Sequence, residues 1–180
     1  MLVSKKSCLS ESMEIPSTFS ELKKRHLELH CACKEFRSYL RGMAKQLITE
    51  YIQSLLLPAD TWKDCKGKSR PYVDTGVWVS RDEHELKSVP IPELDLDDSY
   101  ILNFVIITTL DDHPVTGGFS HGVDVSLWCE GDKLYVLVGF GKNATTFYVS
   151  PQDNFHEVVA AIKLTLYLDM EDSRPGKTLY

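Results

Sequence analysis

Residues 122–150 constrain the fold more than any other part of the chain, because apolar and polar residues alternate along them in two consecutive runs. Such alternation is typical of strands that bury only one of their faces. The runs, 122–130 and 133–140, are separated by Gly131 and Asp132, a Gly-led pair that favours a two-residue hairpin turn. The sequence therefore predicts two antiparallel neighbours.

The turn also predicts the register of this hairpin. It places Leu127 opposite Val136, and every pair on that side is then apolar. A slip by one residue would move the apolar side chains to the other face, so the register is strongly specified. A second short turn leads into a third strand, 144–150, in which we expect Val138 to lie opposite Phe147 on the same face.

Two further strands precede this segment. Residues 72–79 are rich in β-branched and aromatic residues, and residues 100–110 are apolar at both odd and even positions, which is typical of a central strand. Between them, residues 80–99 carry seven acidic residues and two prolines and are interpreted as a long acidic loop. The polar stretch 59–70 is interpreted as another loop.

A long helix is predicted over residues 19–56. Thr18 and Glu21 have the spacing of a capping box, and Pro58 ends the helix. At about 1.5 Å per residue the helix would span about 57 Å, so we expect either a break near Gly42 or participation in a dimer. Apolar and small residues recur every 3.5 positions, a seam that favours a helical partner. The seam consists of Leu22, His26, Leu29, Cys33, Phe36, Leu40, Met43 and Leu47.

A second helix is predicted over residues 151–168, with Ser150 as its N-cap and Pro151 at its first position. Beyond Lys163, leucines alternate as they would in a strand, and the sequence leaves both interpretations open. The fold class is α+β, with a mainly antiparallel sheet of about five strands. We expect a disordered lead-in (1–16), a single α+β domain (17–170) and a loose tail (171–180).

Charge is distributed unevenly. Residues 1–70 hold 13 Lys and Arg against 8 Asp and Glu, whereas residues 71–180 hold 7 against 18. The acidic half disfavours double-stranded nucleic acid as a ligand. No apolar run reaches the roughly 18 residues of a membrane span, and the five cysteines are an odd number without a secretory signal. We therefore expect a soluble cytoplasmic protein with reduced thiols.

The other face of the predicted hairpin carries large side chains where solvent would be expected. They are Trp128, Tyr135, Leu137 and Tyr148, with Trp128 predicted opposite Tyr135 and Leu137 opposite Tyr148. One explanation is a second core layer, covered by a helix. The other is an exposed patch for a protein or ligand partner, because aromatic residues dominate binding hot spots.

The long helix carries candidate ligands for a metal ion. His26, His30 and Cys33 share one side of it, and Cys65 offers a fourth ligand of the type zinc prefers. However, His26 and Cys33 also belong to the seam, where both have a packing role. We predict no cofactor and keep these residues as candidates only.

Acid, base and nucleophile types gather after the predicted central strand. The candidates are Asp111, Asp112, His113 and His121. The same residue types are common in any exposed strand connection, and a catalytic triad is defined by geometry rather than by closeness in sequence. We therefore assign no catalytic residue from the sequence.

These observations favour a non-enzymatic protein-binding or accessory protein, such as a small bacterial inhibitor, an immunity-like factor or an adaptor, acting through the aromatic sheet face. The expected partner is another protein or a second copy in a homodimer, and a small-molecule ligand stays open. The alternative is a small hydrolase or transferase that uses His113, His121 and the neighbouring aspartates.

Overall fold

The computed structural model of the chain describes residues 18–113, 115–150 and 154–173. The chain divides into two compact units, residues 1–36 and residues 37–180. The first helix, α1 (Phe19–Leu55), begins in the first unit and ends in the second. Within the described ranges no helix combines the length and the apolar character that crossing a membrane requires.

The start of α1 has the predicted capping box. The backbone N–H of Glu21 donates to Thr18 Oγ1 at 3.3 Å, and the backbone N–H of Thr18 donates to Glu21 Oε2 at 3.0 Å. These bonds satisfy two backbone groups that a helix start leaves without intrahelical partners. The predicted N-terminal boundary is confirmed.

The end of α1 also agrees with the prediction. Leu56 has a φ of 51°, a left-handed conformation that terminates the helix just before Pro58. The helix runs through Gly42 without a break, so the alternative of a break there is wrong. From Arg37 onward the predicted seam residues Leu40 and Leu47 are buried and Met43 is half-buried. The other buried residues of this helix are Ala44, Ile48 and Tyr51.

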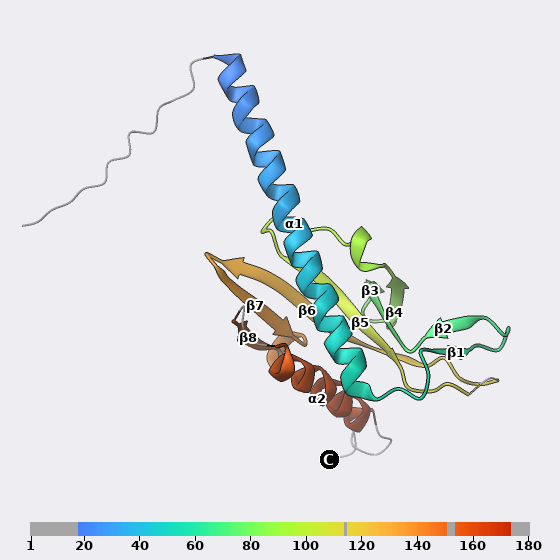
Figure 1. The fold of residues 1–180 in the computed structure, drawn as a ribbon. Helices are drawn as coiled ribbons and strands as arrows, with labels where there is room; N and C mark the ends of the chain where they lie inside the picture. The colour runs from blue at the N-terminus through green and yellow to red at the C-terminus, as the bar shows by residue number, and fades with distance from the viewer. Residues whose placement is uncertain (1–17, 114, 151–153, 174–180) are drawn as a thin grey trace, which may run out of the picture. The chain divides into compact units, whose positions relative to one another are not determined.

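The second unit contains a six-stranded antiparallel sheet in the order β4-β3-β5-β6-β7-β8 (Figure 1). The strands are β3 (Val73–Ser80), β4 (Glu85–Ser88), β5 (Leu102–Thr109), β6 (Ser120–Glu130), β7 (Lys133–Val138) and β8 (Thr145–Val149). The fold is therefore α+β, as predicted. The expected central strand is β5, in which Val105 and Ile107 are buried on one face and Phe104 and Ile106 on the other.

The register of the β6–β7 hairpin is the predicted one, with Leu127 opposite Val136. The predicted register between β7 and β8 is wrong by two residues, because Val138 lies opposite Thr145. The connection between these strands is not a two-residue turn but a longer loop that contains the 3-10 helix η2 (Gly141–Asn143). A shift by two residues keeps each side chain on its predicted face.

Three short strands occur where the sequence predicted loops. Strands β1 (Thr61–Lys63) and β2 (Ser69–Pro71) form a separate two-stranded sheet, and β4 lies within the stretch interpreted as an acidic loop. The same stretch contains the 3-10 helix η1 (Ile91–Glu93). Strand β4 is held by pairing with β3, with Lys87 opposite Val77. That tertiary pairing overrides the low strand propensity of its acidic surroundings.

The second helix, α2 (His156–Asp172), begins later than predicted. Ser150 is therefore not its N-cap, and Pro151 lies outside the described residues. The backbone N–H of Phe155 instead donates to Glu50 Oε2 of α1 at 2.8 Å, so a side chain distant in sequence caps this helix. Past Lys163 the chain continues as helix, which resolves the ambiguity in its leucine pattern.

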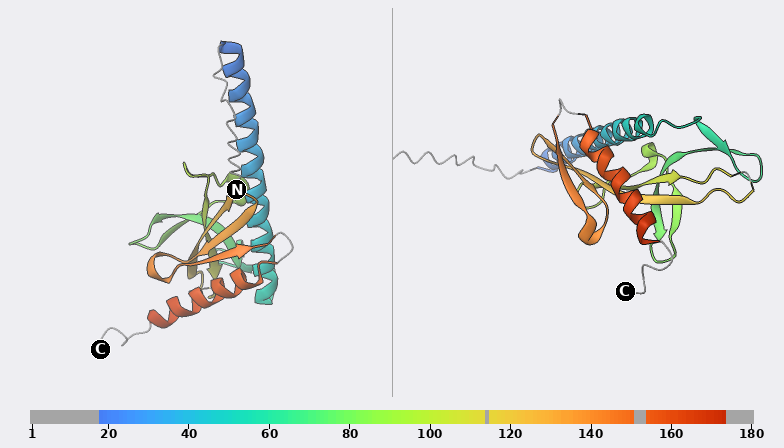
Figure 2. Two further views of the ribbon diagram at one scale, coloured as in Figure 1. Left: turned by 90° about the vertical axis from the view of Figure 1, so that its left-hand side faces the viewer. Right: turned by 90° about the horizontal axis from the view of Figure 1, so that it is seen from below.

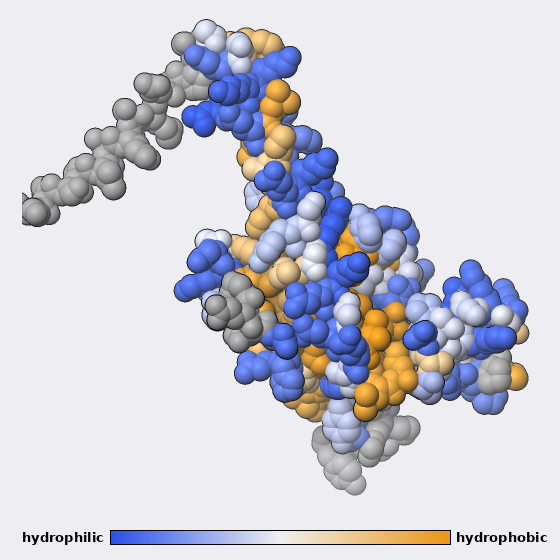
Figure 3. All heavy atoms as spheres, in the orientation of Figure 1, coloured by the Kyte–Doolittle hydropathy of each residue, from blue (hydrophilic) through white to orange (hydrophobic). Residues whose placement is uncertain are grey.

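Both α2 and the part of α1 in the second unit lie on the same face of the sheet (Figure 2). Tyr51 of α1 forms a hydrogen bond of 2.9 Å with Thr108 Oγ1 of β5, and α2 packs on β6, β7 and β8. The sheet contributes aliphatic and phenylalanine side chains to this core. They are Leu102, Phe104, Ile106, Val123, Val125, Leu127, Leu134, Val136 and Val138. Seen from this side, apolar surface gathers beside the C-terminal end of α1, where Leu56 is exposed (Figure 3).

Candidate functional site

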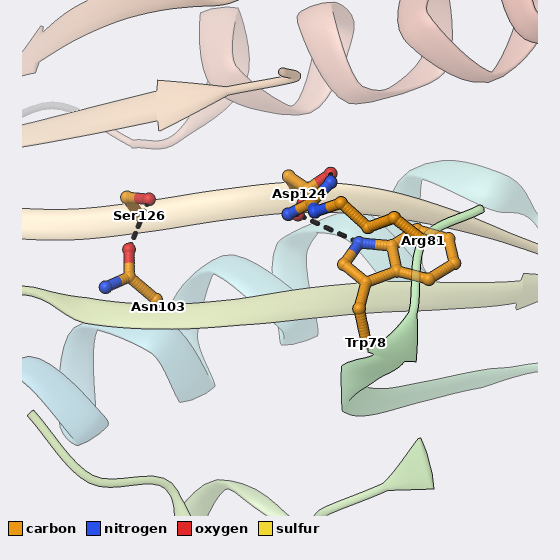
Figure 4. Close-up of polar contacts among 5 residues, drawn as sticks. All are labelled: Trp78, Arg81, Asn103, Asp124 and Ser126. Carbon is orange, nitrogen blue, oxygen red and sulfur yellow. Dashed lines mark hydrogen bonds and ion pairs between the residues drawn. The ribbon is translucent and has the colours of Figure 1, made fainter. Parts of the chain in front are cut away.

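The side chains that alternate with the core residues point to the opposite face of the six-stranded sheet, which we call the open face. In Figure 4, α1 passes behind β5 and β6, while Trp78 and Asp124 lie on the viewer's side. Within the described residues both helices pack on the other face, and only the C-terminal end of α2 reaches the border of the open face. The sequence left open whether a helix covers the aromatic side chains of this face. In the structure, α1 and α2 do not cover them.

One end of the open face carries the residues that the sequence singled out, and we call this group the aromatic platform. It consists of Trp128, Tyr135, Leu137 and Tyr148. The rings of Trp128 and Tyr135 stack with centroids 5.6 Å apart and an interplanar angle of 17°, and Tyr148 is 5.8 Å beyond Tyr135. The predicted pair of Trp128 and Tyr135 is confirmed, whereas Leu137 lies opposite Thr146 and Tyr148 lies opposite Tyr135.

Polar groups orient the platform without covering it. The indole N–H of Trp128 donates to Glu130 Oε1 at 3.2 Å, and the ammonium of Lys133 lies 5.9 Å from the ring centre of Tyr148. Tyr148 is nevertheless 54% exposed. The three rings, with Tyr135 in contact with the other two, thus form a continuous apolar surface with polar edges.

The middle of the open face holds an ion pair (Figure 4). Both guanidinium nitrogens Nη1 and Nη2 of Arg81 donate to the carboxylate of Asp124, the first at 2.8 Å and the second at 2.6 Å. The indole N–H of Trp78 donates to the same carboxylate at 3.0 Å. The hydrogen bonds to Asp124 raise the pKa of Arg81. This bidentate geometry fixes the position of Arg81 on the sheet.

Gly122 explains how Trp78 reaches this position. A Cβ atom at Gly122 would lie 2.9 Å from the ring of Trp78 and 2.9 Å from Val105. The absence of a side chain therefore lets the indole lie against the strand, above Val105. Beside it, Ser126 donates a hydrogen bond of 2.6 Å to Asn103 (Figure 4).

At the other end of the open face lies a cavity of about 910 Å³, bounded by β1, β2, the loop after β5 and the C-terminal end of α2, which contributes Asp169 and Met170. Its apolar lining includes Trp62, Trp78, Ile107 and Phe119. Trp62 is only 9% exposed, and its indole N–H has no hydrogen-bond partner among the described residues. A buried donor without a partner is uncommon and calls for an explanation.

The sequence missed this cavity. Trp62 and Trp78 come from segments far apart in the sequence, and no local motif connects them. One feature of the sequence could have indicated part of the cavity: Trp78 lies in a predicted strand, and the alternation of side chains places it on the same face as Asp74. Trp62 lay in a stretch interpreted as a loop, so its burial could not be expected.

The candidate catalytic aspartates have local structural roles. Asp111 Oδ1 accepts a hydrogen bond from the backbone N–H of His113 at 3.0 Å. Asp112 Oδ2 accepts one of 2.6 Å from the hydroxyl of Tyr72, and this bond raises the pKa of Tyr72. Both carboxylates therefore stabilise the loop after β5 and its contact with the start of β3.

The two candidate histidines have different environments. His113 Nδ1 faces its own loop and accepts a hydrogen bond from the backbone N–H of Thr116 at 3.2 Å. His121 is half-buried on β6, with its Nδ1 4.0 Å from Asp169 of α2 and its ring 5.1 Å from that of Phe119. His121 lines the cavity and His113 does not. The pair thus lacks the shared contact that acid–base catalysis would use.

The metal candidates belong to different units. His26, His30 and Cys33 lie on the first half of α1, and Cys65 lies in the connection between β1 and β2. Over the described ranges no three His, Cys, Asp or Glu side chains are grouped closely enough to hold a metal ion. Within the described residues, Cys31, Cys33, Cys65 and Cys129 form no disulfide.

Comparisons with known proteins add no relatives: no family model matches the sequence, and no match was found among curated proteins or solved structures. The functional argument therefore depends on the open face itself. Its three parts are the aromatic platform, the Arg81–Asp124 ion pair and the cavity beside Trp62.

Proposed function

We propose that the protein is a non-enzymatic binding protein, an accessory, inhibitor or adaptor factor, that docks another protein on the open face of its sheet. The observation that carries this proposal is the placement of both described helices on one face, which leaves a stacked aromatic platform on the other. A sheet whose second face is meant for solvent carries small and charged polar residues there.

The composition of the platform suits protein recognition. Tryptophan and tyrosine are enriched among residues that contribute most to binding energy, because they present large apolar area together with a polar edge. Here the rings are held by cross-strand pairing on neighbouring strands, so little side-chain freedom is left to lose on binding. A preorganised surface of this kind gains affinity mainly by avoiding that entropic cost.

Charge selects among the possible occupants. Residues 37–180 carry 14 Lys and Arg against 21 Asp and Glu. This excess repels nucleic-acid phosphates, and it also repels a second acidic unit of the same kind. The open face is therefore proposed to bind a different protein. Self-association through the seam on α1 stays a prediction. Two residues of this seam, Leu22 and Leu29, are 54% and 58% exposed.

The test uses the full chain as bait in an extract of the source cells. We expect the wild type to retain a protein that a Trp128→Ala/Tyr148→Ala double variant does not retain. The matched control is Leu164→Ala, which removes a side chain 57% exposed on α2 and should retain the same protein. Far-UV circular dichroism and the denaturation midpoint must first show that the double variant is folded.

Three outcomes would contradict the proposal. The wild type retains nothing beyond the blank, the double variant retains the same protein equally well, or the control loses it. Sedimentation velocity tests the remaining alternative, a second copy on the open face. A dimer at micromolar concentration that dissociates in the double variant would show that the occupant is the protein itself.

The candidate catalytic residues support no second proposal. Asp111 and His113 are engaged within one loop, and Asp112 is bonded to Tyr72. A hydrolase or transferase would require these groups to converge on one reacting atom.

A further inference from the structure

The cavity at the end of the open face contains features that the aromatic platform does not explain. It is bounded by β1, β2, the loop after β5 and the C-terminal end of α2, and its volume of about 910 Å³ is within the usual range of ligand sites. It has apolar walls, and its carboxylates outnumber its guanidinium groups. Each of these features restricts what can bind there.

The walls favour an occupant with an apolar stem. Ile107 is 9% exposed and forms part of the lining, with the indoles of Trp62 and Trp78 and the ring of Phe119. Gly118 has a φ of 108°, and a Cβ atom there would lie 3.2 Å from the ring of Trp62. The backbone at Gly118 thus passes close to the indole, which keeps Trp62 in place at the cavity wall.

The charged groups favour a cation. The lining contains the carboxylates of Asp64, Asp74 and Asp169 and one guanidinium, that of Arg70. Arg70 is paired with Asp64 at 3.1 Å. Asp74 accepts its hydrogen bonds from neutral groups, the hydroxyl of Ser88 at 2.6 Å and the backbone N–H of Thr75 at 2.8 Å. Its negative charge is therefore available to a cationic ligand, and indole rings also attract cations.

Trp62 forms part of the wall rather than a polar contact for the ligand. Its Nε1 is shielded from solvent and has no hydrogen-bond partner among the described residues. Its ring belongs to the lining, where it offers apolar and cation–π contact. The apolar walls and Asp74 together fit an apolar stem with a terminal cation, which a basic side chain of a peptide supplies.

We infer that the cavity binds an arginine or lysine side chain of an extended peptide segment. In this arrangement the methylene stem packs on Ile107 and the rings, and the cation lies near Asp74. The inference rests on the proposed function in one respect: the segment is taken to belong to the protein that docks on the open face. The excess of acidic residues in residues 37–180 favours such a basic partner.

The chain offers a direct readout, because its three tryptophans lie in separate parts of the open face. Trp62 reports on the cavity, Trp78 on its border with the Arg81–Asp124 ion pair and Trp128 on the platform. In a ¹⁵N–¹H spectrum of the full chain, each indole N–H gives its own signal, assigned by Trp→Phe variants. The probe is Nα-acetyl-arginine methylamide, and the matched neutral probe is Nα-acetyl-norleucine methylamide.

We expect the arginine probe, in contact with the ring of Trp62, to shift the Trp62 signal in a saturable way and to leave Trp128 unchanged. The norleucine probe should bind at least fivefold more weakly, because it lacks the cation. Asp74→Asn should weaken binding of the arginine probe at least fivefold and leave binding of the norleucine probe unchanged. Asp132→Asn, an exposed carboxylate in the β6–β7 turn, is the matched control and should change neither.

Equal binding of the two probes, an unchanged Trp62 signal at saturating probe, or equal effects of Asp74→Asn and Asp132→Asn would overturn the inference. These outcomes are independent of the proposed function. If the Trp128/Tyr148 variant still retains the partner while the arginine probe shifts Trp62 as described, the platform proposal fails and the cavity inference stands. In the opposite case the platform is supported and the cavity inference fails.

Discussion

The two faces of the sheet differ in the kind of side chain they carry. On the helix side, Leu102, Ile106, Leu127 and Val136 are all 0% exposed. On the open face, Tyr135 of β7 lies between two aromatic neighbours, Trp128 of β6 and Tyr148 of β8. Tyr148 is 54% exposed. Both faces belong to the same strands, so the alternation along β6 and β7 separates a packed core from a binding surface.

The polar groups differ in the same way. The helix side has the buried pair of Tyr51 and Thr108, in which one hydrogen bond joins α1 to the sheet. The open face has the ion pair of Arg81 and Asp124, whose side chains are 43% and 20% exposed. A buried hydrogen bond supports stability, whereas a half-exposed ion pair contributes little to it and remains available for contact. The face that stabilises the fold and the face proposed to bind a partner are thus chemically distinct.

The largest expected difference in stability is between substitutions of two leucines on neighbouring strands, one on each face of the sheet. Leu127→Ala should lower the free energy of unfolding by about 3 kcal/mol, because it leaves a cavity in the core. Leu137→Ala, on the open face and half-buried, should lower it by less than about 1 kcal/mol. Chemical denaturation followed by circular dichroism measures both. Similar losses would contradict the assignment of the two faces.

The next effect concerns the hydrogen bond between α1 and the sheet. Tyr51→Phe should cost roughly 1 to 2 kcal/mol, since Thr108 Oγ1 is then left without its partner in the core. A Tyr51→Phe/Thr108→Val double variant should recover part of this loss, because neither polar group remains. Denaturation of the wild type, the two single variants and the double variant gives the coupling free energy between the two groups. If the losses in the two single variants simply add up in the double variant, the two groups do not interact.

The same tyrosine should make stability depend on alkaline pH. Burial raises the pKa of Tyr51, an effect that its hydrogen bond with Thr108 partly offsets. A group whose pKa is higher in the folded state stabilises the fold fully below its unfolded pKa of about 10 and loses that contribution as pH rises further. Wild-type stability should therefore fall above pH 10 more steeply than that of Tyr51→Phe. Urea denaturation at pH 9 to 11 measures the free energy of unfolding of both proteins. The same dependence on pH in wild type and Tyr51→Phe would refute this prediction.

The smallest effect is expected on the open face. Asp124→Asn should lower stability by less than about 1 kcal/mol, because the ion pair with Arg81 is partly exposed and screened by solvent. It should nevertheless move the indole N–H signal of Trp78, which donates to Asp124. A loss of several kcal/mol would place this ion pair among the structural elements of the core and would weaken the contrast between the faces.

The sequence predicted the parts of this comparison that depend on short-range patterns. The alternation around Gly131 was sufficient to place Leu127 opposite Val136 and Trp128 opposite Tyr135, because a two-residue turn fixes the register of both strands. The loop after Val138 contains two residues of positive φ, Gly139 and Gly141, and its length could not be read from one turn signal.

What the sequence could not predict depends on contacts between distant segments. Glu50 caps α2 from another helix, and nothing near Phe155 indicates it. The face on which the helices pack is likewise a tertiary choice, since both faces of β6 and β7 carry apolar side chains. The cavity depends on the position of Trp62, which comes from a hairpin that its polar composition concealed.

Hydroxyl-radical footprinting of the full chain tests the central claim, that the aromatic face is free of cover in this protein. Three tyrosines provide the scale: Tyr51 is 0% exposed, Tyr100 is 49% exposed and Tyr148 of the platform is 54% exposed. We predict that Tyr148 is oxidised at a rate close to that of Tyr100 and far above that of Tyr51. Protection of Tyr148 to the level of Tyr51 in the protein alone would show that the face is already covered and would contradict the account.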